Sequence, residues 1–233
     1  MKKLLFTMVV AIMALTASAQ RASSSSSSFF STEKADNPVT FSIRGGVNFS
    51  NLSVEGDGLD SRTGFHGGVN VDIPLLQSLY LSTGLYYTAK GYSINVDDDG
   101  ASKNIYTAEY KAAGNYLELP VLASYRYDFS DNAQLQVNVG PYLAYGIGGK
   151  IKIKETDGVY SSGQLITKEI EEEVDYFDDD TNNKFDGGLQ IGAGMTFAKH
   201  IYMGVAYEFG FVNVIDDVKS KNSNFMVSLG YQF

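Results

Sequence analysis

The chain has 233 residues, no cysteine and a formal net charge of -9. The absence of cysteine excludes disulfide bonds and thiolate metal sites. The negative charge argues against a nucleic acid as partner, because proteins that bind nucleic acids present a basic surface. With 24 glycines, 16 tyrosines and 4 prolines, the composition suits one domain of many strands rich in small and aromatic residues.

The first 19 residues have the pattern of a secretory signal peptide. Met1-Lys2-Lys3 is a short cationic start, and residues 4–15 form an apolar run interrupted by one threonine. Ala17-Ser18-Ala19 then supplies a small-residue cleavage site. The run is too short and wrongly flanked for a membrane-spanning helix. We therefore expect an exported precursor whose signal peptide covers 1–19.

Residues 20–38 are polar and contain an unbroken serine run, Ser23 to Ser28. Such a segment cannot bury enough apolar surface to fold, which predicts a flexible linker. We expect a single domain over residues 39–233, after this linker.

From Phe41 onward the sequence alternates between apolar and small or polar residues with a period of two. This alternation is typical of strands that have one apolar face. In the first such segment, Phe41, Ile43 and Phe49 share one face, whereas Ser42 and Arg44 lie on the other. The eight predicted strands cover 41–50, 65–73, 79–88, 117–127, 134–147, 186–197, 201–211 and 225–233.

The predicted connections alternate in length along the chain. The long, polar and often acidic ones are 52–62, 91–113, 149–182 and 213–222, and the short ones are 74–78, 128–132 and 198–200. Outer-membrane barrels have an even number of strands, short periplasmic turns and longer extracellular loops. The sequence therefore predicts an all-β fold: an eight-stranded, antiparallel, up-and-down transmembrane β-barrel in the outer membrane of a Gram-negative bacterium.

Side-chain size indicates which face of the barrel is outside. The polar face carries mostly Gly, Ser, Asn and Gln, which suit the narrow interior of an eight-stranded barrel. The other face carries Leu, Ile, Val, Phe and Tyr on every strand, and this volume suits contact with outer-membrane lipid. A soluble barrel with an apolar interior is the alternative that alternation alone leaves open.

Four segments resemble the PorT-like outer-membrane β-barrel family. They are Gly45-Gly46-Val47-Asn48-Phe49-Ser50-Asn51-Leu52, Tyr116-Leu117-Glu118-Leu119-Pro120-Val121-Leu122, Gly140-Pro141-Tyr142-Leu143-Ala144-Tyr145-Gly146 and Val227-Ser228-Leu229-Gly230-Tyr231-Gln232-Phe233. The resemblance implies an integral, porin-like outer-membrane barrel, and most members of the family have no determined function. Its namesake is linked to a protein secretion system, but the matching residues here are structural strand residues. The terminal Phe233 resembles the aromatic C-terminus that barrel-assembly machinery recognises.

Charged residues on the predicted lumen face are the most informative candidates for a site. They are Arg44, His66, Asp72, Lys90, Glu118, Arg126 and Glu208. Strand direction places Arg44, Asp72 and Arg126 near the periplasmic end. The other four fall nearer the outer end, where Asp186 is a further candidate.

Opposite charges in a poorly hydrated lumen satisfy one another, whereas an unpaired one is costly. The pairs Arg44/Asp72 and Lys90/Glu118 lie on neighbouring predicted strands. We therefore expect two layers of ion pairs that fill the barrel. The alternative is that these residues form a gate for ions or small solutes.

The predicted outer loops carry acidic runs, among which Asp178, Asp180 and Asn182 have the spaced oxygens of a calcium loop. The glycine and the distant glutamate of that pattern are not at the required offsets, so a solvated surface is favoured over a metal site. No cofactor is implied. The histidines, His66 and His200, have no partner at a recognised catalytic spacing, although Asp60 lies close to His66 in the sequence.

These observations favour a non-enzymatic barrel with a plugged lumen and a structural, surface-interaction or accessory role. The predicted loop 149–182 is the best candidate for contact with a surface partner, being the longest and most acidic. The second hypothesis is a channel for ions or small solutes, or a transport-associated barrel. The third is an outer-membrane enzyme that uses His66.

Overall fold

The computed structural model describes residues 37–54, 60–98, 104–130, 132–161, 164–177, 182–215 and 219–233. The predicted signal peptide (1–19) and the predicted linker (20–38), except its last two residues, lie outside these ranges. No helix within the described ranges is long and apolar enough to cross a membrane. The strands are β1 (Thr40–Val54), β2 (Asp60–Pro74), β3 (Leu79–Asp98), β4 (Asn104–Ser130), β5 (Ala133–Ser161), β6 (Gln164–Asp175), β7 (Phe185–Phe197), β8 (Ile201–Asn213) and β9 (Ser220–Gln232).

Eight of the strands close into a ring. Each strand pairs antiparallel with its neighbour in the order β1-β2-β3-β4-β5-β7-β8-β9, and β9 returns to pair with β1. The closing seam runs from Ser42↔Gln232 to Val54↔Ser220. The predicted eight-stranded up-and-down barrel is therefore confirmed. The strand β6 lies outside the ring and pairs with the far end of β5.

The ring has an apolar outside and a polar inside. Large apolar side chains on all eight ring strands face outward, such as Phe41, Val69 and Leu229. Their counterparts on the other face, such as Asn48 and Ser124, are buried in the lumen. This distribution is the reverse of a soluble barrel and is that of a barrel in lipid.

Glycines allow large side chains to fit inside the ring. A Cβ on Gly194 or Gly204 would lie 2.6 Å or 2.2 Å from the side chain of Tyr202. Since real Cβ atoms do not approach so closely, these two glycines make the space for the Tyr202 ring in the lumen. The same residues that give the polar face its small volume therefore admit a few large aromatic residues.

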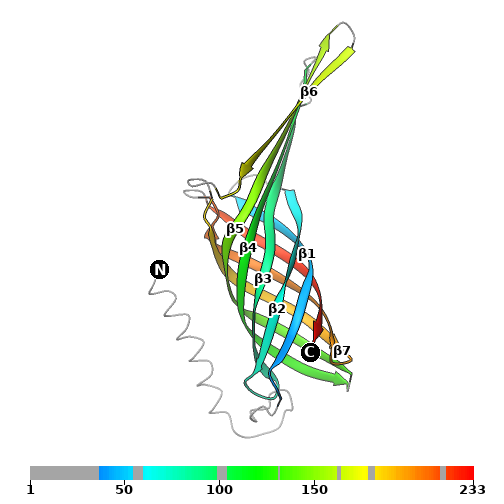
Figure 1. Ribbon diagram of the computed structural model, residues 1–233, viewed down its shortest axis with the longest axis vertical. Helices are drawn as coiled ribbons and strands as arrows, with labels where there is room; N and C mark the ends of the chain where they lie inside the picture. The colour runs from blue at the N-terminus through cyan, green and yellow to red at the C-terminus, as the bar shows by residue number, and fades with distance from the viewer. Residues whose placement is uncertain are drawn as a thin grey trace.

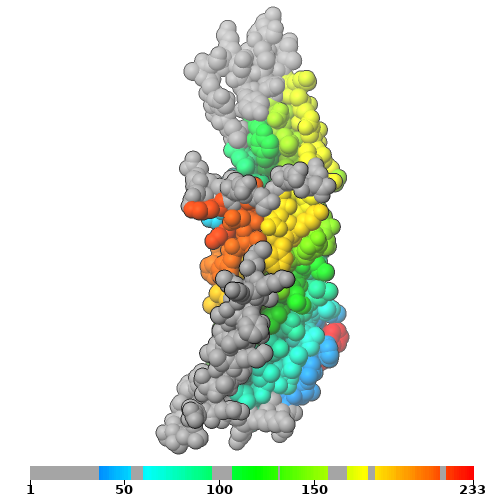
Figure 2. Space-filling view, turned by 90° about the vertical axis from the view of Figure 1, so that its left-hand side faces the viewer, coloured from blue at the N-terminus to red at the C-terminus, as the bar shows by residue number. Residues whose placement is uncertain are grey.

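A second sheet continues from one side of the ring. The strands β3 and β4 stay paired up to Asp98↔Tyr106, β4 and β5 up to Asn104↔Val159, and β6 folds back along β5 from Ser161↔Gln164 to Lys150↔Asp175. We call residues 91–98, 104–114, 149–161 and 164–175 the extension sheet, and residues 150–175 the β5–β6 hairpin. Figure 1 shows β3, β4, β5 and β6 rising beyond the ring. In Figure 2 the green-to-yellow surface of β4, β5 and β6 reaches beyond the orange surface of β8.

The prediction that 91–113 and 149–182 are long loops is therefore wrong for most of their length. The alternation of period two continues through both segments, as in Lys150-Ile151-Lys152-Ile153-Lys154. These strands are amphipathic, but their charged residues made them resemble solvated loops. A strand in a sheet can carry charged residues on one face and apolar residues on the other, just as the ring strands carry polar residues on the face toward the lumen.

The polarity of the two faces inverts where the extension sheet begins. On the outside of β5, Ile147 is 56% exposed and faces outward with the lipid-facing residues, but the next residue on that face is Lys150. On β4 the same face changes from Leu117 to Lys111. On the inner face, the polar lumen residues give way to Tyr92, Ile94, Ala108, Ala112, Ile151 and Ile153.

Two glycines occupy the bend at this inversion. The register between β4 and β5 shifts at Asn115/Tyr116, where Ile147, next to Gly148, is the extra residue on β5. Gly148 and Gly149 have φ values of 155° and 153°, which favour glycine. A Cβ on Gly149 would also lie 2.1 Å from the carbonyl oxygen of Ala113. This bulge lets β5 leave the ring and remain paired with β4.

Candidate functional site

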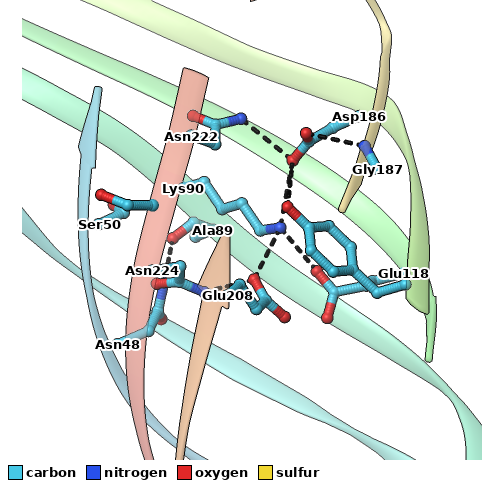
Figure 3. Close-up of polar contacts among 12 residues, drawn as sticks. Asn48, Ser50, Ala89, Lys90, Glu118, Asp186, Gly187, Glu208, Asn222 and Asn224 are labelled. Carbon is cyan, nitrogen blue, oxygen red and sulfur yellow. Dashed lines mark hydrogen bonds and ion pairs between the residues drawn. The ribbon is translucent and has the colours of Figure 1, made fainter. Parts of the chain in front are cut away.

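The outer half of the lumen holds a lysine that contacts three carboxylates. The Nζ atom of Lys90 on β3 lies 2.8 Å from Glu118 Oε2 on β4, 2.9 Å from Glu208 Oε2 on β8 and 3.3 Å from Asp186 Oδ2 on β7. Figure 3 shows the ammonium group at the centre of these carboxylates. All four side chains are almost completely buried. We call this group the acidic layer.

Neighbouring groups donate hydrogen bonds to two carboxylates of the acidic layer, Glu208 and Asp186. Asn224 donates to Glu208 Oε2 at 3.1 Å, and Asn222 donates to Asp186 Oδ2 at 3.1 Å. The backbone N–H of Gly187 donates to Asp186 Oδ1 at 2.8 Å. The Lys90 ammonium also lies 4.3 Å from the centre of the Tyr142 ring, a cation–π distance. The number of carboxylates in contact with the ammonium, three, equals the number of its N–H donors.

The inner half of the lumen holds the opposite arrangement, one carboxylate between two guanidinium groups. Asp72 Oδ2 lies 2.7 Å from Arg126 Nη2 and 3.1 Å from Arg44 Nη2. The guanidinium of Arg44 stacks over Tyr202 at 4.1 Å, and that of Arg126 over Tyr80 at 4.2 Å. We call Arg44, Asp72 and Arg126 the basic layer. The structure thus brings together six of the seven predicted lumen residues, with Asp186 added, in two groups.

The seventh predicted residue, His66, belongs to neither layer. Its ring lines a cavity of about 50 Å³ between Glu118 and Arg44. Its Nε2 atom lies 2.8 Å from Ser228 Oγ. On the neighbouring strand β3, His66 pairs with Thr88, two residues before Lys90.

The sequence proximity of His66 and Asp60 does not become a contact. A register shift between Ser61 and His66 turns Asp60 to the outer face of the sheet, where it accepts a hydrogen bond of 3.1 Å from Asn95. The other histidine, His200, lies in the turn between β7 and β8 and stacks on Tyr231 at 5.4 Å. Within the described ranges, neither histidine has an ion pair with a carboxylate.

An aromatic cap closes the lumen above the acidic layer. It consists of the buried side chains of Leu52, Tyr116, Tyr142, Tyr176, Phe177 and Val214. The rings of Tyr176 and Phe177 meet edge to face at 4.8 Å. Phe177 occupies the space above Gly146, where a Cβ would lie 2.3 Å from the ring. The sequence placed Tyr176 and Phe177 in an outer loop, so sequence analysis missed this cap.

The weak calcium-loop candidate is tested only at one residue. Asp178 and Asp180 lie outside the described residues. Asn182 donates a hydrogen bond of 2.7 Å to the carbonyl oxygen of Tyr176, so its side-chain nitrogen supports the aromatic cap. The described residues contain no group of three or more His, Cys, Asp or Glu side chains that could hold a metal ion.

The outer face of the β5–β6 hairpin carries a ladder of ion pairs. Glu173 contacts Lys150 at 2.5 Å and Lys152 at 3.0 Å, and Lys154 contacts Glu171. These side chains are about half exposed or more. Hydrogen bonds from Lys150 and Lys152 lower the pKa of Glu173 to about 2. The hydrogen bond that Lys154 donates to Glu171 raises the pKa of Lys154 above its usual value.

The family of the chain follows from a comparison of its sequence. The family model described as "Outer membrane protein beta-barrel domain" matches residues 19–216. The chain belongs to this family. It is therefore an outer-membrane β-barrel protein of a Gram-negative bacterium. No curated protein sequence matches it.

Several solved outer-membrane barrels resemble this family member in structure. Ail, the attachment invasion locus protein of Yersinia pestis, is 18% identical, with 84% of this chain and 99% of Ail covered and a TM-score of 0.38. OprG of Pseudomonas aeruginosa is 15% identical, with 86% and 97% covered and a TM-score of 0.40. Neisserial surface protein A is 15% identical, with 84% and 98% covered and a TM-score of 0.36.

For an outer-membrane barrel, the inversion of polarity marks the edge of the lipid. Below it, the outside of the ring carries Phe, Val, Leu and Ile residues such as Ile147. Above it, the same surface carries Lys111, Lys150 and Lys152, whose charges do not belong in hydrocarbon. The extension sheet consequently lies outside the bilayer. The turns at the opposite end are the short ones, a length typical of the periplasmic side.

Proposed function

We propose that the protein is a closed, non-enzymatic anchor in the outer membrane, which presents the extension sheet at the cell surface to a partner. The observation that carries this proposal is the continuation of four strands beyond the lipid edge, above a lumen that is filled. We further propose that residues 1–19 direct export, and that the PorT-like segments place the chain in that branch of the family.

The contents of the lumen support a closed barrel. Lys90 contacts three carboxylates, Asp72 contacts two arginines, and the aromatic cap lies above both layers. The cavity between the layers, about 50 Å³, has room for a few water molecules, because about 10–15 Å³ of such cavity volume is enough to hold one. An ion or a solute could pass only if these buried contacts separated, which would expose unpaired charges at high cost.

The extension sheet supports a role in surface contact. Its strands project from the membrane, so its faces and its outer edge are accessible to large molecules (Figure 1). It covers most of the segment 149–182, which the sequence identifies as the best candidate for partner contact. A barrel that transports solutes has no need of a projecting sheet, whereas a surface-interaction protein does.

Planar-bilayer recording tests the closed lumen. The purified full-length protein is expected to produce no current steps above those of the bare bilayer. A matched control is a variant in which residues 151–174 are replaced by a short turn, which should be equally silent. Stable ohmic steps from the wild-type protein would contradict the proposal and support the channel hypothesis.

Cysteine labelling tests the presentation of the sheet, because the natural chain contains no cysteine. On intact cells, a membrane-impermeant maleimide should label Lys152→Cys, on the outer face of the hairpin. It should not label Lys199→Cys, in the turn between β7 and β8, until the outer membrane is permeabilised. The reverse pattern would place the extension sheet in the periplasm and overturn the proposed role.

A further inference from the structure

The strand β6 has one edge without a neighbouring strand. It pairs with β5 along its whole length, and no other described residue pairs with it. Next to the paired end, the N–H of Tyr176 donates to the carbonyl oxygen of Gly149 at 3.1 Å. Because an antiparallel strand turns alternate residues toward each neighbour, the even-numbered residues bond to β5. The N–H and C=O groups of Thr167, Glu169, Glu171 and Glu173 therefore point away from it.

The side chains beside this free edge are strongly acidic. The β5–β6 hairpin contains four lysines, at 150, 152, 154 and 168, against seven Asp and Glu residues, which leaves a formal charge of -3. The lysines of β5 engage Glu171 and Glu173. Within the described ranges, Glu169 and Glu172 have no cation within ion-pair distance. The excess negative charge thus lies on β6, next to the unpaired backbone groups.

The opposite face of β6 is partly apolar. Ile170 is 36% exposed and Val174 is 42% exposed; they flank Glu172 on this face and continue the apolar inner face that Ile151 and Ile153 begin on β5. A strand placed beside β6 would cover these side chains if its own residues at the matching positions were apolar. The free edge therefore sets a pattern for its neighbour: basic residues on one face and apolar residues on the other.

We propose that the free edge of β6 binds an extended segment of another protein by strand addition, and that this segment alternates Lys or Arg with apolar residues. The inference rests on the proposed function and names the class of partner. The strand β5 already shows the required chemistry, since Lys150-Ile151-Lys152-Ile153-Lys154 lies on the other edge of β6 in the same way. Main-chain hydrogen bonds supply affinity in such an interface, and alternate side chains supply specificity.

The acidic side chains at this edge also disfavour a second copy of the same chain as the binding partner. Two copies of β6 placed edge to edge would oppose Glu to Glu, which is repulsive. A second copy cannot offer its β5, because both edges of β5 between Lys150 and Val159 are paired within the same chain. A basic segment of a different protein remains as the occupant that the charges favour.

A peptide with the sequence of residues 150–156, Lys-Ile-Lys-Ile-Lys-Glu-Thr, is the probe. Its fluorescence anisotropy is measured with the full-length protein in nanodiscs. Saturable binding is expected at low salt, and it should weaken as the ionic strength rises from about 0.05 M to about 0.5 M, because salt screens exposed charges. The control peptide Glu-Ile-Glu-Ile-Glu-Lys-Thr should not bind. Equal binding of both peptides, or no binding of the basic one, would overturn the proposal.

Two substitutions at one position separate strand addition from simple charge attraction. Glu169→Pro removes an N–H that points away from β5 and should weaken peptide binding at least about tenfold, because proline cannot donate to an added strand. Glu169→Gln removes the charge, keeps the N–H and should weaken binding less. Heat-modifiable mobility must show that both variants fold. Equal binding by Glu169→Pro and Glu169→Gln would contradict strand addition.

Hydrogen exchange supplies a second measurement. The peptide should slow exchange of the N–H groups of Thr167, Glu169 and Glu171, which face the free edge. The N–H groups of Ile170 and Glu172, which already bond to β5, should change little. Strand addition is wrong, and the anchor function stands, if the basic peptide does not bind while the protein gives no current steps in the bilayer and Lys152→Cys is labelled on intact cells. Conducting wild-type protein would instead remove the anchor function itself.

Discussion

The acidic layer and the ion pairs on the outer face of the β5–β6 hairpin use the same types of side chain, the first buried and the second exposed to water. In the lumen, Lys90 is 1% exposed and contacts three carboxylates. On the hairpin, the Lys150 side chain is 59% exposed and contacts Glu173 alone. Water screens the second interaction and leaves the first at full strength. A lysine–glutamate contact is therefore a structural requirement in one region and a surface property in the other.

This difference separates stability from recognition within one chain. The lumen charges have no alternative partner, so each must be matched where it stands. The hairpin charges can exchange their partners for water or for a ligand at little cost. The charged contacts inside the ring are accordingly fixed, whereas those on the extension sheet can be exchanged for contacts with water or a ligand.

The strongest test of the comparison removes the central cation of the lumen. Lys90→Met leaves three buried carboxylates without their partner and should lower the free energy of unfolding by about 3–5 kcal/mol. Urea unfolding followed by circular dichroism measures this change, and the folded fraction is checked by heat-modifiable mobility. Lys152→Met on the hairpin is the matched control and should leave global unfolding unchanged. Similarly small changes in the free energy of unfolding for both variants would contradict the difference between the buried and the exposed contacts.

A companion variant tests the cause of that loss. In Lys90→Met/Glu118→Gln/Glu208→Gln, two of the three stranded charges are removed together with the lysine. The variant should recover part of the stability lost by Lys90→Met, because a neutral amide costs less to bury than an unpaired carboxylate. No recovery would indicate that packing around Lys90, rather than its charge, determines the effect.

The aromatic cap lies between the two regions and should give a smaller effect. Phe177→Ala removes a buried ring that packs on Tyr116 and Tyr176 and should cost about 3 kcal/mol, the lower end for such truncations. Because the charged layers below stay intact, bilayer recordings of this variant should remain silent. Current steps would show that the cap alone keeps the lumen closed.

The smallest expected effect is the pH dependence of the hairpin. The folded-state pKa of Glu173 is lowered to about 2, so its pairing stabilises the hairpin above about pH 4.5 and is lost as the pH falls toward 2. The pKa of Lys154 is raised, so its pairing holds below about pH 10.5 and is lost at higher pH. The protection factors of the β6 amides, which compare their exchange with that of an unstructured chain at the same pH, should be highest between these limits, with global unfolding unaffected over that range. Protection factors that do not change with pH would contradict a ladder of ion pairs.

The alternation of side chains was enough to predict the barrel and its lumen residues. Arg44 and Asp72 lie on neighbouring strands, so their proximity could be inferred from strand order. The contacts of Lys90 with Glu208 and Asp186, and of Arg126 with Asp72, cross the lumen between strands that are not neighbours. No local pattern reports such contacts, because they depend on how the closed ring staggers its strands.

The extension sheet and the cap were missed for a different physical reason. Above the lipid edge the charged face of a strand is outside, and sequence analysis took that charge as the mark of a solvated loop. Tyr176 and Phe177 gain their burial only by folding back over Gly146 and Gly114. Such tertiary packing has no period of its own in the sequence.

The extension sheet has a consequence for the order in which this protein is assembled. Its charged strands end on the far side of the membrane from the short turns, so they must cross the bilayer during insertion. A lumen with room for a few waters cannot let a folded hairpin through afterwards. Residues 91–114 and 149–175 must therefore cross while the ring is still open. The ring, including the seam between β1 and β9, is then complete only after the part of the molecule that meets the outside has crossed.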